Sequence, residues 1–242
     1  MNKCVVFDLD ETIGHFAQLY QISKIFEMFK SDSLYEQALS ECHEMLEIDR
    51  EMFNESINAL RTSDSAEIPI DIYAMDKKIN SFERDVRRKV MTHLAISGSQ
   101  DLGSGLILTS VVIDIERVGD YTKNIYDLAV SYPTKLNAGT FEDKLSTIEH
   151  NTKDYFNRTI DTFKSQDIDS ARELMGNYKE EISEVSQSIV EGVISGKDDS
   201  LSASQAASVV LYSRYLKRIA AHSRNLISSI VNPFERIGYK EQ

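Results

Sequence analysis

The stretch "SGLILTSVVIDIERVGDYTKNI", residues 104–125, decides the fold of this chain. Its apolar residues recur three and four positions apart, as on one face of an α-helix, at Leu108, Val111, Ile115, Val118 and Ile125. The following segment "SYPTKLNAG" contains Pro133 and Gly139, which mark a connection between helices. The sequence therefore predicts an amphipathic helix that starts near Ser104 and ends before Pro133.

The same periodicity precedes this helix. One predicted helix begins at Ser33, which could cap it, and has an apolar face made of Leu39, Cys42, Leu46, Phe53, Ile57 and Leu60. The next begins near Ile70 and carries Met75, Ile79, Phe82, Val86 and Val90. Residues 31–135 thus contain three predicted helices.

The second half repeats the pattern about a hundred residues later. Its three apolar faces comprise Leu145, Ile148, Phe156, Ile160 and Phe163; then Leu174, Tyr178, Ile182, Val185, Ile189 and Val193; and finally Val209, Leu216, Ile219, Leu226 and Ile230. Short connections favour antiparallel neighbours. We predict an all-α protein with two tandem three-helix bundles, at residues 31–135 and 136–242, after an extension at residues 1–30.

The amino-acid composition argues against a sheet protein, a nucleic-acid-binding protein and a membrane protein. The 242 residues include only three Pro and ten Gly, which is little punctuation for a sheet protein, and the formal net charge of -12 repels nucleic acid at long range. Two cysteines fit a reducing compartment. The longest mostly apolar stretch, "LILTSVVI" at 106–113, is far shorter than the roughly 20 residues of a membrane helix. We expect a cytoplasmic protein without membrane insertion or nucleic-acid binding.

The stretch "VVFDLDETIGHF", residues 5–16, resembles the first motif of the haloacid dehalogenase phosphatases. That resemblance would make Asp8 a nucleophile and Asp10 a general acid and base. Such an enzyme needs a parallel sheet, and beyond "CVVF" the sequence offers no convincing strand. We interpret Asp8 or Asp10 as the cap of a helix and keep the phosphatase as the alternative.

Acidic residues lie beside the apolar stripe of two predicted helices. Glu116 and Asp120 are four apart and stack on one face, and Asp76 and Glu83 are seven apart on the preceding helix. Together they could supply four carboxylates to a metal ion, because bundles commonly assemble such sites from inward-facing acids. Gly119, inside the helix, indicates close helix approach or room for a ligand.

The alternative interpretation of these acids is a solvated charged face on which Arg117 and Lys123 are local ion partners. Asp49 interrupts the apolar face of the first helix, and we interpret it as an acid at the helix edge, with a side chain that reaches inward as the alternative. The basic residues Arg84, Arg87, Arg88 and Lys89 form a local patch that we interpret as a solvated face, with partner binding as the alternative.

The run from Asp114 to Asp120, followed by Asn124 and Ile125, resembles the signature of the PhoU family of phosphate-signalling regulators, which are built from two three-helix repeats. The segment "DKKINSFERDVRRKVMTHLAISG", residues 76–98, is similar to the branch of that family associated with sodium/phosphate cotransporter-like proteins. The resemblance implies a metal-binding role for Glu116 and Asp120, and more loosely for Asp76 and Glu83.

The second repeat departs from the family pattern. In "YLKRIAAHSRNLI", residues 215–227, Lys217 and Ala221 stand where the pattern places acids, while Arg218, His222 and Asn225 keep their places. The resemblance therefore implies at most one metal cluster per chain. Tyr121 stands where histidine is usual, which leaves the number of ligands open.

These features together predict a non-enzymatic, metal-binding regulator of phosphate transport or signalling. The resemblance implies a divalent or trivalent metal ion, with iron, zinc, manganese and magnesium all open. It also implies a phosphate transporter component or a sensor kinase as partner, and a homodimer is a further expectation. The alternatives are a phosphatase using Asp8 and Asp10, and a helical interaction module without metal.

Overall fold

The computed structural model describes residues 9–97, 101–132 and 134–241, with side chains from Leu34 onward. The described chain is helical and contains no strand, which confirms the all-α prediction. The α-helices are α1 (Leu9–Arg61), α2 (Ile72–Ser97), α3 (Leu102–Ser131), α4 (Glu142–Ser165), α5 (Ile168–Tyr178), α6 (Glu184–Ile194) and α7 (Ala203–Val231).

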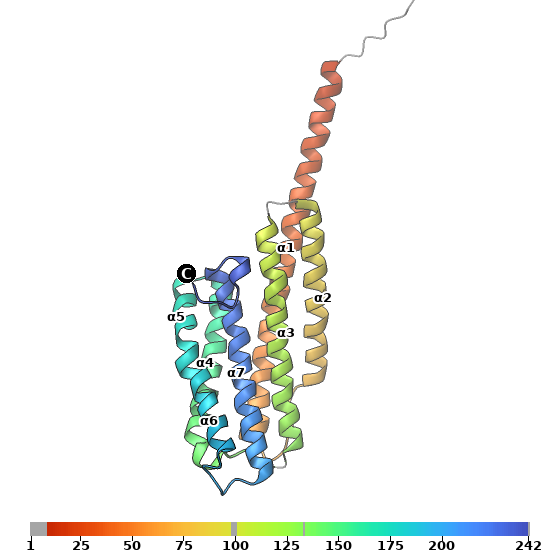
Figure 1. The fold of residues 1–242 in the computed structure, drawn as a ribbon. Helices are drawn as coiled ribbons and strands as arrows, with labels where there is room; N and C mark the ends of the chain where they lie inside the picture. The colour runs from red at the N-terminus through yellow and green to blue at the C-terminus, as the bar shows by residue number, and fades with distance from the viewer. Residues whose placement is uncertain (1–8, 98–100, 133, 242) are drawn as a thin grey trace, which may run out of the picture.

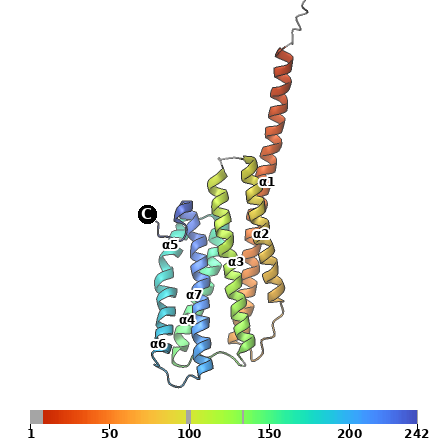
Figure 2. The same cartoon turned by 45° about the vertical axis from the view of Figure 1, so that its right-hand side comes forward.

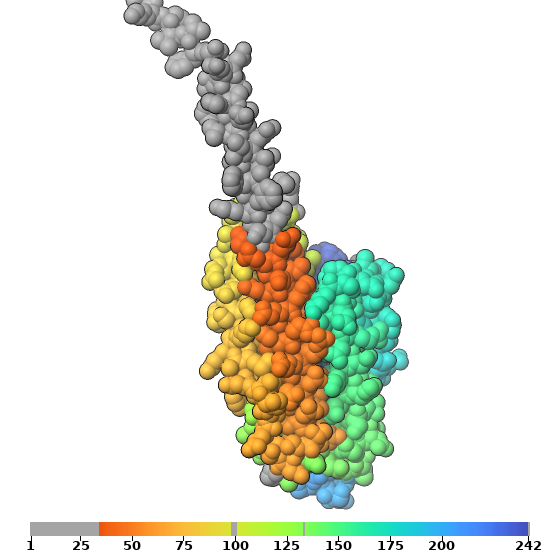
Figure 3. Space-filling model, turned by 180° about the vertical axis from the view of Figure 1, so that it is seen from behind, coloured from red at the N-terminus to blue at the C-terminus, as the bar shows by residue number. Residues whose placement is uncertain are grey.

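The helices form two groups that lie side by side (Figure 1). α1, α2 and α3 pack together as the first bundle, while α4, α7 and the consecutive helices α5 and α6 form the second (Figure 2). α3 and α7 make the main contact between the bundles. Seen from behind, α1 lies between α2 and α4 (Figure 3). Each bundle therefore covers one side of the other.

The helix expected to begin at Ser33 begins at Leu9 instead. α1 is 53 residues long and extends beyond the ends of α2 and α3 (Figure 1). The prediction of a cap at Ser33 is wrong because serine in a helix interior costs only a few tenths of a kcal/mol, and no Pro or Gly lies between residues 15 and 61 to stop the helix. Asp10 falls in the first turn of α1, whereas Asp8 and the segment "CVVF" lie outside the described residues.

The predicted apolar faces form the core. In α1 the side chains of Cys42, Leu46, Phe53, Ile57 and Leu60 are buried. Phe53 meets Phe156 of α4 edge to face, with ring centroids 6.0 Å apart, so the cores of the two bundles are continuous.

The middle helix of the second bundle differs from the prediction of one uninterrupted α-helix. A π-helical turn at Lys179–Ser183 joins α5 to α6. Asp167 starts α5 as its cap, because its carboxylate accepts from the backbone N–H groups of Asp169 and Ser170. The π turn inserts an extra residue per turn, and Leu174, Ile182 and Ile189 all remain buried across it.

Candidate functional site: an acid cluster in the first bundle

Asp49 of α1 is fully buried. Neither of its carboxylate oxygens has a hydrogen-bond partner among the residues that the structure describes. Our interpretation of Asp49 as an acid at the helix edge is therefore wrong. The inward alternative holds: Asp49 follows Leu46 by three residues and precedes Phe53 by four, so it lies within the apolar stripe of α1.

Gly119 of α3 makes the room that Asp49 occupies. A Cβ atom on Gly119 would lie 2.8 Å from Asp49 Oδ1 and 3.0 Å from Ile79 Cδ1. The expectation that Gly119 marks close helix approach is confirmed. The three helices of the first bundle thus meet at one buried carboxylate, with α2 contributing Ile79.

Three of the four predicted site residues, Glu116, Asp76 and Asp120, carry charges that act on Asp49. Burial raises the pKa of Asp49 well above its ordinary value, and the nearby charges of Glu116, Asp76 and Asp120 raise it further. Burial and Asp120 raise the pKa of Glu116; Arg117 opposes them, and Glu83 and Asp76 add to them. We call Asp49, Asp76, Glu83, Glu116 and Asp120 the acid cluster.

Basic side chains neutralise the outer members of the acid cluster. Lys123 Nζ lies 2.7 Å from Asp76 Oδ1 and 3.3 Å from Asp120 Oδ1. Arg117 Nη1 lies 2.9 Å from Asp120 Oδ2. These ion pairs are the ones that the solvated-face interpretation predicts. Asp49 forms none of them, so it is the uncompensated member of the cluster.

Glu83, the fourth predicted site residue, pairs with Arg87 on the next turn of α2, with 2.7 Å between Oε1 and Nη2. Arg88 and Lys89 of the predicted basic patch likewise bind Asp85 and Glu41, each at 2.6 Å. Most of that patch is therefore neutralised within the chain.

The donor chemistry of the acid cluster suits a hard or borderline cation, because all five side chains are carboxylates and one has no partner. Their present positions do not form a coordination sphere. Within the described part of the chain, no group of three or more His, Cys, Asp or Glu side chains is arranged to hold a metal ion. Metal binding at Glu116, Asp120, Asp76 and Glu83 stays a prediction.

Residues 42–129 match the family model of the PhoU domain. These residues form a PhoU domain. The crystal structure of PhoU from Pseudomonas aeruginosa is similar, with a TM-score of 0.74 and 20% identity over 83% of this chain and 96% of that one. The phosphate transport system regulatory protein PhoU from Streptococcus pneumoniae gives a TM-score of 0.72 and 17% identity over 83% and 95%. No curated protein matches.

The PhoU domain contains the whole acid cluster and ends in the last turns of α3. The two crystal structures show that the shared fold continues through the second bundle, since they cover far more of the chain than the domain match does. Among the described helices, none is both long and apolar enough to cross a membrane.

The second bundle lacks an equivalent of the acid cluster. Thr152 lies four residues before Phe156, as Asp49 lies four before Phe53, and its buried hydroxyl also has no partner among the described residues. On α7, Lys217 and Ala221 stand at the positions that correspond to Glu116 and Asp120. Three positions that are acidic in the PhoU domain are therefore neutral or basic in the second bundle. This bundle has no carboxylates at these positions to offer a cation.

The residues that keep the family pattern in α7 bind α3 instead. Asp114 Oδ1 accepts hydrogen bonds from His222 Nδ1 at 2.7 Å and from Asn225 Nδ2 at 2.9 Å. Tyr121 stacks on the His222 ring, with centroids 5.7 Å apart, and its hydroxyl accepts from Arg218 Nε at 3.1 Å. Tyr121, where histidine is usual in the family, thus belongs to the contact between the PhoU domain and α7.

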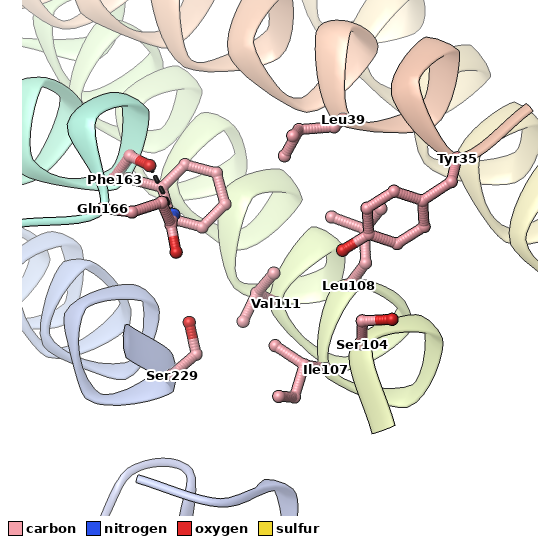
Figure 4. A pocket seen from close by; sticks show the side chains of 9 residues that line it. All are labelled: Tyr35, Leu39, Ser104, Ile107, Leu108, Val111, Phe163, Gln166 and Ser229. Atoms are coloured by element: carbon pink, nitrogen blue, oxygen red, sulfur yellow. Dashed lines mark hydrogen bonds between the residues drawn. The ribbon is translucent and has the colours of Figure 1, made fainter. Parts of the chain in front are cut away.

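A separate pocket of about 310 Å³ lies where α1, α3, α4 and α7 meet. Its lining is mostly apolar, with Leu39, Val111 and Phe163 around the space, and the side chains of Tyr35 and Ser229 add two hydroxyl groups (Figure 4). No charged side chain lines it. Its chemistry differs from that of the acid cluster, and we assign it no part in metal binding.

Proposed function

We propose that this protein is a non-enzymatic regulator of phosphate transport or phosphate signalling that acts by binding a transporter component or a sensor kinase. The PhoU domain at residues 42–129 supports this proposal, together with the fold shared with the phosphate transport system regulatory protein PhoU from Streptococcus pneumoniae. Its expected place of action is the cytoplasm.

We further propose that the acid cluster binds a divalent or trivalent metal ion. The observation that carries this proposal is the buried carboxylate of Asp49, which has no partner among the described residues and faces other acids from α2 and α3. A bound cation would supply the positive charge that this carboxylate lacks. Asp49, Asp76, Glu116 and Asp120 would hold it, with Glu83 as a further donor.

Binding would require the outer carboxylates to exchange partners. Asp76 and Asp120 would release Lys123, and Glu116 and Asp120 would release Arg117. Because these acids come from α2 and α3 and Asp49 comes from α1, their convergence would fix the three helices of the PhoU domain relative to one another. We expect the partner to bind the outer surface of α1, α2 and α3 when the metal holds these helices in place.

Elemental analysis of the purified protein tests the metal site. We expect wild-type protein to retain metal and Asp49→Asn, Glu116→Gln and Asp120→Asn to lose most of it. Glu44→Gln is the matched control, because Glu44 is a half-exposed acid of α1 that pairs with Lys78 outside the cluster. Equal metal content in all five proteins would exclude the site assignment.

A metal-free interaction module is the second candidate, and the ion pairs of Lys123 and Arg117 favour it. Thermal unfolding with and without a chelator separates the two candidates. A populated metal site stabilises the fold by about 2.7 kcal/mol at a hundredfold excess of metal over its dissociation constant. An unchanged melting temperature would support the metal-free module. Affinity capture from phosphate-replete and phosphate-starved cells then identifies the partner in either case.

A further inference from the structure

Helix α7 carries an unbalanced positive charge. Its basic residues are Arg214, Lys217, Arg218 and Arg224, and it contains no Asp or Glu, although the whole chain has a formal net charge of -12. None of the four pairs with a carboxylate in the described part of the chain; Arg218, for example, bonds to Tyr121 and His222. Clustered unpaired cations in an acidic protein create a local field that attracts anions.

Three of these cations act on Tyr178, the last residue of α5. The Arg224 guanidinium lies over the Tyr178 ring, 5.5 Å from its centroid. Burial raises the pKa of Tyr178, while a hydrogen bond with Ser183 and the charges of Arg224, Arg218 and Arg214 oppose that rise. The π turn begins directly after Tyr178, so an irregular backbone borders this group of cations.

A pocket of about 530 Å³ opens beside Tyr178 and Arg224, between α5, α7 and the C-terminal segment. We call it the α5–α7 pocket. Its lining contains four basic side chains and two acidic ones: Arg172, Lys179, Arg224, Lys240, Glu180 and Glu241. Arg172 binds Glu241, with two contacts of 2.8 Å, and Lys179 lies 3.4 Å from Glu184. Arg224 and Lys240 have no carboxylate partner among the described residues.

A buried polar group stands next to these cations. Tyr155 of α4 is only 2% exposed, and its hydroxyl has no hydrogen-bond partner among the described residues. Its ring centroid is 6.3 Å from that of Tyr178, and among the charged groups near it Arg224 acts on its hydroxyl most strongly.

We propose that the α5–α7 pocket binds a doubly charged tetrahedral oxyanion of the phosphate class, with Arg224 and Lys240 as its direct ligands. The planar guanidinium of Arg224 donates two parallel N–H groups that match two oxygens of such an anion. Arg224 and Lys240, the two lining cations without a carboxylate partner among the described residues, supply two positive charges to a dianion, and the other basic residues of α7 attract it from solution. This site lies in the second bundle and does not depend on metal binding in the first.

Calorimetric titration with inorganic phosphate tests the proposal, at constant ionic strength and with a chelator present so that metal plays no part. We expect saturable binding to the wild-type protein, competition by sulfate, and at least tenfold weaker binding in Arg224→Gln. Arg84→Gln is the matched control, because Arg84 is an exposed cation of α2 with no ion pair in the described chain, and its loss removes the same charge. Equal weakening in Arg224→Gln and Arg84→Gln would overturn the proposal.

Lys240→Gln provides a second test. Lys240 is exposed near the end of the chain, so its replacement leaves the helical core intact while removing a proposed ligand. Vesicles of phosphatidic acid, whose phosphomonoester can carry two charges, with phosphatidylcholine vesicles as reference, show whether a lipid phosphate can replace the free anion. Binding of either phosphate source that depends on Arg224 and Lys240 but not on Arg84 supports the pocket. Failure of both sources to bind, or binding insensitive to Lys240→Gln, contradicts it.

Discussion

Within the acid cluster, Asp49 is the residue that destabilises the folded protein most. Asp76, Glu83, Glu116 and Asp120 each have a basic neighbour, but Asp49 has none among the described residues. A buried carboxylate without a counter-charge destabilises the folded state, and the ordinary outcome is that it stays protonated to a higher pH. Asp49 therefore lowers the stability of the metal-free protein. A cation bound to its oxygens would remove this destabilisation.

Replacing Asp49 with Asn should stabilise the metal-free protein at pH 7 by about 1–3 kcal/mol, because the neutral amide has nearly the size of the carboxyl group but does not carry the free energy cost of keeping a buried carboxyl protonated. The raised pKa of Asp49 means that the folded state holds this proton more tightly than the unfolded state. Its penalty is thus absent below the unfolded pKa of about 3.9 and grows as the pH rises toward the folded pKa. Urea unfolding with chelator at pH 4.5 and pH 7.5 measures this. A variant less stable than wild type at pH 7.5 would contradict the argument.

Gly119→Ala should destabilise the fold although alanine is the better helix former. The added Cβ would lie 2.8 Å from Asp49 Oδ1, and overpacking of a buried site costs about 1–3 kcal/mol. Gly176→Ala is the matched control, since nothing lies within 4 Å of its Cβ position in α5, and it should gain up to about 1 kcal/mol. Chemical denaturation of both variants decides the matter, and equal shifts of the same sign would show that Gly119 is not tightly packed.

At the scale of the helix, the periodic apolar residues predict which segments are helical and which side chains are buried. They do not predict which helices contact one another. Leu108, Val111, Ile115 and Ile125 of α3 are buried as expected. The bonds from Asp114 of the same helix to His222 and Asn225 of α7 have no local signal, because they join residues more than a hundred positions apart. The boundary at Ser33 was wrong: the helix expected after Asp8 or Asp10 and the helix expected from Ser33 are one continuous helix, α1, because a single serine is too weak a signal to interrupt a helix.

In the candidate site, too, local spacing predicts some features and tertiary contacts decide the others. The spacing of Glu116 and Asp120 predicts a shared face, and in the structure Lys123 joins Asp120 to Asp76 of α2. Burial of Asp49 depends on α3 bringing Gly119 against α1, which is a tertiary contact that no spacing within α1 reveals. The position of Asp49 inside the apolar stripe was the available signal. The sequence thus identifies the acids of one helix, while packing decides which of them is central.

The C-terminal end of α1 is held to the second bundle by a charged network at Arg61. Its side chain is 10% exposed; Nε donates to Glu149 Oε2 at 3.0 Å, and its other nitrogens donate to Glu142 and the Leu136 carbonyl. The Tyr212 hydroxyl of α7 donates to the same Glu149 oxygen at 2.7 Å. Three helices from both bundles are therefore joined at one largely buried guanidinium.

Arg61→Met should lower the free energy of unfolding by about 2–3 kcal/mol, because it leaves Glu142 and Glu149 without their cation. The value is set below the usual 3–5 kcal/mol for a broken buried pair, since both glutamates are partly exposed. Lys78→Met removes a half-exposed pair with Glu44 and should cost less than about 1 kcal/mol. Denaturant unfolding compares the two. Similar losses in both variants would mean that Arg61 acts only as a surface charge.

At the scale of the whole molecule, the two bundles share one core although only the first matches the PhoU domain model. Phe53 and Phe156 meet between α1 and α4, α3 packs along α7, and Arg61 joins both bundles. The bundles differ in charge, with the acid cluster in the first and the unpaired cations of α7 in the second. A shared core combined with divergent charge indicates one folding unit with two chemically different surfaces.

We therefore expect a single cooperative unfolding transition, with coincident curves from helical circular dichroism and tyrosine fluorescence. Phe156→Ala should lower the free energy of unfolding by about 3–5 kcal/mol, as expected for a fully buried aromatic ring, and should leave the slope against denaturant unchanged. The reason is that Phe156 lies in the contact between the bundles, so its loss weakens both together. Two separated transitions, in the wild type or in Phe156→Ala, would show instead that the bundles unfold independently and that their contact contributes little to stability.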